Sequence, residues 1–222
     1  MSNLAWSYSS LKTFQSCPKK YYHLKVLKDV KESTSEIMLY GVDAHKSAEL
    51  YIGEGVDIPE KYGFMRGQLD KLKAIKGDKY CEYKFGITAE MEPCDFFAKN
   101  VWLRGVIDLL VIDKESGTAR IVDYKFGKSK NADPSQLQLM ALAVFKLFPE
   151  IKIVKAGLLF CVEDKFIPSK YSTDDAPTMW MDWLPDVNRL AGAYKSNVWN
   201  ARPSGLCKAW CPVLSCSHNG RK

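Results

Sequence analysis

The feature that most constrains this chain is a change in the spacing of its apolar residues near Lys79. Before that point apolar side chains recur every three or four residues, which is the helical period. After it, three segments rich in Val, Ile, Tyr, Phe and Trp have the composition of strands. We predict strands over Tyr80–Thr88, Val101–Asp113 and Ala119–Phe126. Because only the short segment Lys114–Thr118 separates the last two, they should pair as an antiparallel hairpin.

Further segments complete an α/β pattern around these strands. Helical spacing and caps predict helices over Ser7–Cys17, Glu36–Ile52, Pro59–Ile75, Pro134–Phe148 and Ala176–Trp199, the last interrupted or restarted at Pro185. Ile151–Val162 is apolar nearly throughout, as expected of a strand at the centre of a sheet. We therefore expect a mixed central β-sheet flanked by helices.

The composition is that of a folded globular protein. Of 222 residues, 46% are hydrophobic and 26% charged, so we expect one domain, 1–222, with its own core. Its parts would be a helical N-terminal part (1–78), a sheet core (79–170) and a helical, cysteine-rich C-terminal part (171–222). An excess of 32 Lys and Arg over 26 Asp and Glu gives a net charge of +6, which suits a polyanionic partner.

The start of the chain, residues 1–14, lacks the continuous apolar segment of a secretory signal. No segment reaches the roughly 20 apolar residues needed to cross a bilayer. We expect an intracellular, cytoplasmic protein without a membrane span.

Two carboxylates and a lysine lie on the predicted hairpin. Asp123 and Lys125 are two residues apart in one strand, so they share a face, whereas Val122 and Tyr124 face the other way. If the turn brings Asp108 to the same face, two carboxylates can hold a divalent cation, and Lys125 can orient a water beside it. Such a site hydrolyses phosphodiesters. The alternative is an Asp–Lys surface pair of little energetic weight.

Short motifs along the chain follow one order. They are Ser9–Phe14 with Cys17-Pro18, His45, Gly105–Asp108, Asp123-Tyr-Lys125, Gln136–Met140, and a C-terminal cluster of Cys207, Cys211 and Cys216. In this order they resemble the PD-(D/E)XK nuclease superfamily, and specifically its RecB-like, CRISPR-adaptation-type exonuclease branch. The resemblance spans nearly the whole chain. It implies a restriction-endonuclease-like core, with the cysteine-rich tail docked on the N-terminal helices. It also implies a divalent-metal-dependent DNA exonuclease of recombination, repair or replication.

The resemblance also implies a role for each matching residue. The catalytic residues would be Asp108, Asp123, Lys125 and Gln136, and the ligands of Mg²⁺ or Mn²⁺ would be His45, Asp108, Asp123 and the main-chain carbonyl of Tyr124. Lys125 would position the attacking water and stabilise charge on the phosphate. Gln136 would hold the phosphate or the water, since an amide both donates and accepts.

Three positions leave alternatives open. Met140 stands where the family has Tyr, and Gln138 offers a second amide. Residues two apart on a helix lie about 200° round from one another, so only one amide can face the site, and motif order favours Gln136. Glu82 could add a carboxylate to the metal site or face solvent, and we expect it to face solvent. His45 by itself is better explained as a core histidine of a helix, and only the order of the family motifs favours a metal ligand.

The seven cysteines, in a chain without an export signal, argue against a disulfide framework. Three of them, Cys207, Cys211 and Cys216, are close in sequence. The resemblance implies that Cys17 is the fourth ligand of a 4Fe-4S cluster that fastens the tail to the N-terminal helices. Zinc, with another cysteine or His218 completing the set, and the absence of any metal are the alternatives. The remaining thiols are expected to be incidental: Cys81, Cys94 and Cys161.

DNA is the expected partner, and family analogy adds a single-strand binding or annealing protein. Lys128 and Lys130 directly follow the proposed catalytic strand and are suited to neutralise flanking phosphates. A phage origin, with action in the host cytoplasm, would suit the size. Two other functions remain open: a catalytically inactive, metal-stapled DNA-binding or adaptor module, and a zinc-ribbon-like interaction protein.

Overall fold

A computed structural model describes residues 4–33 and 35–221. The chain divides into two compact units. The first consists of Glu36–Trp180 together with the start of the chain up to Ala5, and the second of Trp6–Ser35 together with Met181–Lys222. Residues 1–3, residue 34 and Lys222, which the predicted domain 1–222 includes, lie outside the described residues.

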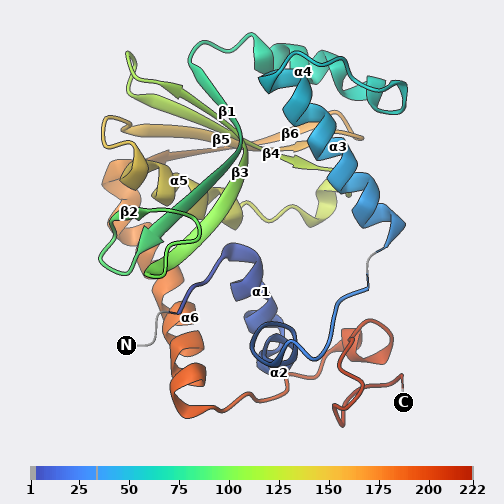
Figure 1. Ribbon diagram of the computed structural model, residues 1–222. Coiled ribbons are helices and arrows are strands. Elements are labelled where there is room, and N and C mark those ends of the chain that lie inside the picture. Colours follow the sequence, from blue (N-terminus) through green and yellow to red (C-terminus); the bar gives the residue numbers. More distant parts are fainter. Residues whose placement is uncertain (1–3, 34, 222) are drawn as a thin grey trace. The chain divides into compact units, whose positions relative to one another are not determined.

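The first unit is built on a six-stranded sheet in the order β2-β1-β3-β4-β5-β6 (Figure 1). Its strands are β1 (Asp78–Thr88), β2 (Pro93–Cys94), β3 (Val101–Asp113), β4 (Thr118–Lys125), β5 (Ile153–Phe160) and β6 (Lys165–Ser172). β4 and β5 are parallel, and every other neighbouring pair is antiparallel. The crossover between the parallel strands is made by α5 (Ser135–Leu147), as such a pair requires. The predicted mixed sheet and its hairpin are therefore confirmed, and the helix predicted over Pro134–Phe148 forms the crossover.

Helices pack on both faces of this sheet. On one face lie α3 (Glu36–Gly53), the 3₁₀ helix η2 (Glu60–Met65) and α4 (Arg66–Lys73). Their buried side chains share a core with Leu109, Val111, Val122, Tyr124 and Leu159 of the sheet. On the other face α5 buries Leu137, Met140, Ala141 and Val144. Short 3₁₀ turns, η3 (Ser129–Asn131) and η4 (Thr173–Asp175), lie in the connections.

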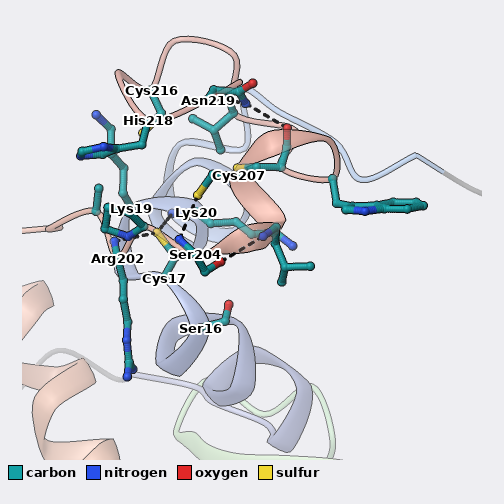
Figure 2. A pocket seen from close by; sticks show the side chains of 16 residues that line it. Ser16, Cys17, Lys19, Lys20, Arg202, Ser204, Cys207, Cys216, His218 and Asn219 are labelled. Carbon is teal, nitrogen blue, oxygen red and sulfur yellow. Dashed lines mark hydrogen bonds between the residues drawn. The ribbon is translucent and has the colours of Figure 1, made fainter. Parts of the chain in front are cut away.

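The second unit is helical and irregular. It holds α1 (Tyr8–Ser16), α2 (Pro18–Tyr21), the π-helix η1 (Tyr22–Leu27), the greater part of α6 (Ala176–Ser196) and the 3₁₀ turn η5 (Gly205–Lys208). Ser7 caps α1 by accepting the Ser10 main-chain N–H, as predicted. Arg202 of the tail donates its main-chain N–H to the Cys17 sulfur at 3.4 Å (Figure 2). The tail is therefore docked on the N-terminal helices.

Some details differ from the sequence-based expectations. The segment predicted as one helix, Pro59–Ile75, begins as the 3₁₀ helix η2, where Gly63 weakens helix formation. The helix expected to break at Pro185 runs through it, although proline cannot donate the main-chain bond there. Strands β2 and β6 were not predicted. In β6, Pro168 and alternating polar residues gave no clear strand pattern.

None of the described helices combines the length and hydropathy needed to cross a bilayer.

Candidate active site

Asp108 lies where β3 and β4 diverge. The paired register of the two strands ends at Leu109 and Val122. Continuing that register would set Asp108 opposite Asp123, on the same face of the sheet. The Asp108 carboxylate accepts the main-chain N–H of Tyr124 at 2.8 Å, a donor that the divergence leaves without a strand partner. The hairpin thus brings the two predicted carboxylates to one end of the sheet.

The glycine of the Gly105–Asp108 motif has a packing role. Gly105 pairs with Phe85 of β1, and the ring of Phe85 lies directly over it. A Cβ added at Gly105 would come within 2.6 Å of that ring, closer than real Cβ contacts. Glycine therefore lets β1 and β3 approach closely just before Asp108.

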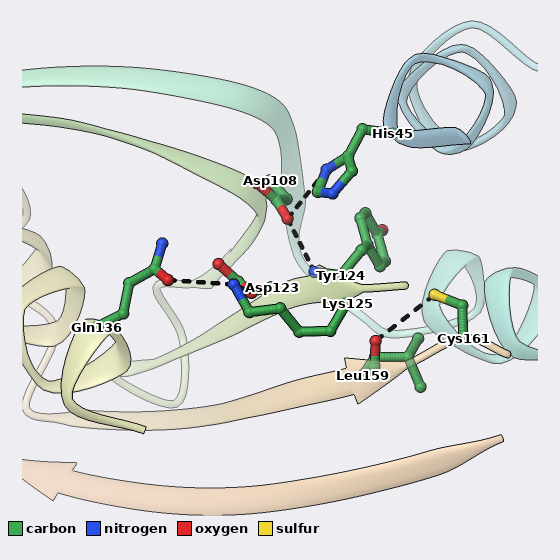
Figure 3. Close-up of polar contacts among 8 residues, drawn as sticks. All are labelled: His45, Asp108, Asp123, Tyr124, Lys125, Gln136, Leu159 and Cys161. Atoms are coloured by element: carbon green, nitrogen blue, oxygen red, sulfur yellow. Dashed lines mark hydrogen bonds and ion pairs between the residues drawn. The ribbon is translucent and has the colours of Figure 1, made fainter. Parts of the chain in front are cut away.

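Asp123 and Lys125 form an ion pair on the side of β4 that faces α5. The Asp123 side chain is 3% exposed, and its Oδ2 lies 2.6 Å from the Lys125 Nζ. Lys125 also donates to the Gln136 Oε1 at 3.2 Å (Figure 3). The ammonium is thus held between a carboxylate and an amide. Gln136 is the amide that motif order indicated.

His45 and Glu82 complete a cluster around Asp108. The His45 Nδ1 lies 3.2 Å from the Asp108 Oδ2 (Figure 3). Glu82 of β1 lies between the pairs Cys81–Leu109 and Tyr83–Ile107, and so opposite Asp108. One ligand atom from each of His45, Glu82 and Asp108 lies within 4.8 Å of the other two. The expectation that Glu82 faces solvent is therefore wrong: its side chain is half-buried in this cluster.

The backbone of Glu82 explains why its position was difficult to predict. Its φ of 48° lies in the left-handed region, which glutamate seldom adopts. Such a residue costs on the order of 1–3 kcal/mol, and strained residues of this kind cluster at active sites and ligand-binding sites. Neither the composition of the strand nor the alternation of its apolar residues indicates this left-handed residue. The only sequence sign was an acidic residue beside Tyr80, Tyr83 and Phe85 in the predicted strand.

The ionisable side chains of this cluster lie close enough to shift one another's pKa values. Burial raises the pKa of Asp123 to about 6, with the charge of Asp108 adding to the shift and Lys125 opposing it. Burial and the charge of Asp108 likewise raise the pKa of Glu82. Burial alone would lower the pKa of His45, but its hydrogen bond to Asp108 and the nearby carboxylates raise it overall. Crowded carboxylates of this kind are relieved by a bound cation.

The donor set fits a hard divalent cation. It offers carboxylate oxygens and an imidazole nitrogen. An open groove of about 530 Å³ leads to this cluster. Its walls are Met38, Gly41, Val42, His45, Lys46, Glu49, Glu82, Val106 and Asp108. A ligand can therefore reach the cluster from solvent.

Tyr124 lies at the centre of the site. Its main-chain N–H is bonded to Asp108, and its buried ring lies 5.8 Å from the His45 ring. Burial raises the pKa of the Tyr124 hydroxyl well above its ordinary value, so the phenol stays protonated. The role of its carbonyl as a metal ligand stays a prediction.

The four predicted cluster cysteines line one small cavity of about 70 Å³ in the second unit (Figure 2). They are Cys17, Cys207, Cys211 and Cys216, and His218 lines the same cavity. The Cys17 sulfur accepts the main-chain N–H groups of Lys20 and Arg202, both at 3.4 Å. Among the described residues, no three of the cysteine sulfurs lie within 4.8 Å of one another.

The other thiols belong to the first unit. Burial raises the pKa of Cys81 to about 11 and that of Cys161 to about 12, so both stay protonated. Burial also raises the pKa of Cys94. A protonated thiol is a poor nucleophile and a poor metal ligand, which agrees with an incidental role.

The fold and the site define a class, that of metal-dependent nucleases. The family model of the PD-(D/E)XK nuclease superfamily matches residues 65–216, well over half of the chain. This protein belongs to that superfamily, whose members act on DNA and use divalent metals such as Mg²⁺ or Mn²⁺. The match includes Glu82, Asp108 and Asp123, whereas Cys17 and His45 lie before its first residue.

Among solved structures, the chain is similar to the crystal structure of SSO0001, with a TM-score of 0.46 and 14% identity. The alignment covers 97% of this chain and 86% of that one. A search of curated protein sequences finds no match.

Proposed function

We propose that this protein is a divalent-metal-dependent DNA exonuclease of the RecB-like branch of its superfamily. The single observation that carries the proposal is the convergence of His45, Glu82 and Asp108 beside the buried Asp123–Lys125 pair. His45, Glu82 and Asp108 line an open groove, and the whole set has both metal-binding and proton-donating members. A degenerate binding module would have no need to keep them together.

His45, Asp108, Asp123 and the Tyr124 carbonyl would hold the cation, and Glu82 joins this predicted set. A bound Mg²⁺ or Mn²⁺ supplies a Lewis acid for the phosphate and lowers the pKa of bound water. Because the ligands come from α3, β1, β3 and β4, the site depends on the folded sheet and not on one flexible loop.

Lys125 has the role of orienting a water and donating a hydrogen bond to the phosphate. Its Nζ has three protons, and the contacts with Asp123 and Gln136 direct two of them. The third is available to substrate, where an ammonium stabilises the charge that grows on the phosphate oxygens. Gln136 acts through Lys125, and its amide N–H groups are available to the phosphate or the water. Water then forms a bond to phosphorus and loses a proton to solvent, while the bond to the departing sugar oxygen breaks and that oxygen takes up a proton from solvent.

The proposed nuclease branch, pathway and origin rest on the order of the sequence motifs and on the length of the chain. Residues 1–222 would act as a single nuclease domain in the cytoplasm, in DNA recombination, repair or replication. Phage-encoded enzymes of this kind work with single-strand binding or annealing proteins, and such a partner belongs to the proposal.

We also propose that Cys17, Cys207, Cys211 and Cys216 hold a 4Fe-4S cluster. The four thiols line one cavity, and in a 4Fe-4S cluster each of four cysteine ligands binds a different iron. Protein purified without oxygen should be brown, and Cys211→Ser should lose both the colour and the bound iron. Colourless wild-type protein with stoichiometric zinc would refute the cluster.

The test of function compares end-labelled linear DNA with closed circular DNA in Mg²⁺ or Mn²⁺. We expect the linear DNA alone to be degraded, and Asp108→Asn to abolish degradation while DNA binding persists. Asp95→Asn, at an exposed position, is the matched control and should be fully active. Cleavage of circular DNA would refute the exonuclease assignment. Full activity of Asp108→Asn would refute the site.

A further inference from the structure

A second, larger groove lies on the face of the sheet that packs against α4. Its volume is about 760 Å³, and none of the residues lining it also lines the catalytic groove. Arg120 and Val122 of β4 line it, so it opens on the side of β4 opposite to Asp123 and Lys125. The groove is therefore separate from the candidate active site.

Four cationic side chains surround this groove. Arg120 of β4 pairs with Lys155 of β5, and Lys155 pairs with Lys170 of β6, so three cations stand in one row across three strands. Lys71 of α4 adds a fourth. Like charges directly opposite one another on a sheet destabilise it. In the described part of the chain no ion pair neutralises any member of the row.

The nearby acidic groups do little to balance these charges. Asp164 is the one carboxylate among the residues that line the groove, and it accepts a hydrogen bond from Gln68 at 2.8 Å. Asp113 of β3 does not line the groove, although the charge of Arg120 contributes to lowering its pKa. The groove thus keeps a net positive charge that an anionic ligand would neutralise.

The floor of the groove is apolar. Leu72 and Ile75 line it from the α4 side, and Phe166 and Pro168 of β6 line it from the sheet. Phe166 is 49% exposed. Its ring lies over Gly157, where an added Cβ would come within 2.0 Å of it. The ligand that fits must therefore combine negative charge with apolar groups.

We propose that this groove binds an extended, acidic segment of a partner protein, in which apolar side chains alternate with carboxylates. The carboxylates pair with the cation row, and the apolar side chains cover the floor. Single-stranded DNA fits less well because bases bind to several aromatic faces, and Phe166 is the one aromatic residue among those lining the groove.

The test uses fluorescence anisotropy with a fluorescein-labelled peptide of alternating Asp and Leu residues, and the full-length protein. A peptide with Ser in place of Leu and an oligothymidylate are the comparison probes. We expect the Asp–Leu peptide to bind at least about tenfold more tightly than the Asp–Ser peptide, and rising salt to weaken the binding.

Substitutions in the groove test whether the peptide binds there and not elsewhere on the protein surface. Lys155→Glu with Lys170→Glu should weaken binding of the Asp–Leu peptide by about tenfold or more, and Phe166→Ala should weaken it severalfold. Lys195→Glu, at an exposed position on α6, is the matched control and should bind as wild type. All the groove variants change exposed side chains and should keep the circular dichroism and the DNA cleavage of wild type.

Two results would overturn the proposal. One is equal binding of the Asp–Leu peptide by wild type and the groove variants. The other is oligothymidylate binding that the groove variants lose while no peptide binds, which would assign the groove to nucleic acid. Neither result depends on the nuclease assignment, because the catalytic residues are unchanged.

Discussion

Replacing Asp123 by Asn should stabilise the metal-free protein, although it removes a residue that we assign to catalysis. Asp123 has an ordinary pKa of 3.8 in the unfolded chain, and burial raises its pKa in the folded protein to about 6. Below pH 3.8 the carboxyl is protonated in both states. As the pH rises from 3.8 towards 6, Asp123 ionises in the unfolded chain but not in the folded protein, so the free energy of unfolding falls. Above about pH 6 Asp123 is ionised in both states, and the loss of stability has reached its full value.

The magnitude follows from the difference between the two pKa values. It corresponds to about 3 kcal/mol near pH 7.5 and to about 1 kcal/mol near pH 4.5. The asparagine amide makes its own contacts, which contribute equally at both pH values. The change with pH therefore reports the ionisation of Asp123 alone. The unfolding free energy of Asp123→Asn minus that of wild type should increase by about 2 kcal/mol from pH 4.5 to pH 7.5.

The assay is unfolding in urea with EDTA, followed by circular dichroism at both pH values. Asp95→Asn, at an exposed site, should track wild type. Adding Mg²⁺ at about pH 7.5 should then stabilise wild type and leave Asp123→Asn nearly unchanged, since a ligand stabilises only the state that binds it. If the unfolding free energies of wild type and Asp123→Asn change by the same amount from pH 4.5 to 7.5, burial does not raise the pKa of Asp123 as we infer.

Two further predictions concern the support of the metal site. Glu82→Gln should weaken Mn²⁺ binding by about tenfold or more in calorimetry, because it removes a charged ligand, whereas Glu92→Gln, at an exposed position, should not. Unchanged Mn²⁺ affinity in Glu82→Gln would remove that residue from the site. Gly105→Ala should cost about 1–3 kcal/mol of unfolding free energy and lower cleavage, because its Cβ would meet the Phe85 ring at 2.6 Å and displace the strand that holds Asp108. Wild-type stability and cleavage in that variant would show that the close approach is not needed.

The parts of the site that follow from strand geometry could be predicted from sequence. Asp123 and Lys125 share a face because they are two residues apart, and Val122 and Tyr124 enter the core for the same reason. The short turn after β3 fixed the hairpin register, which in turn brought Asp108 alongside. These relations depend on local periodicity and turn length, which a sequence displays directly.

Glu82 could not be placed in this way, because its position depends on a left-handed backbone within a strand. Strand β6 was missed for a related reason. Its alternating polar residues and Pro168 resemble a loop, and its pairing with β5 is a long-range contact without a local signal. The cation row across β4, β5 and β6 was invisible for the same reason, since Arg120, Lys155 and Lys170 are distant in sequence.

The most direct test of the central claim is a crystal structure of the protein soaked in Mn²⁺, with an anomalous difference map at the manganese edge. We predict a peak in contact with carboxylate oxygens of Asp108 and Asp123, with His45 and Glu82 beside it. A crystal that holds ordered Mn²⁺ elsewhere, with no anomalous density at these carboxylates, would contradict the assignment of this cluster as the metal centre.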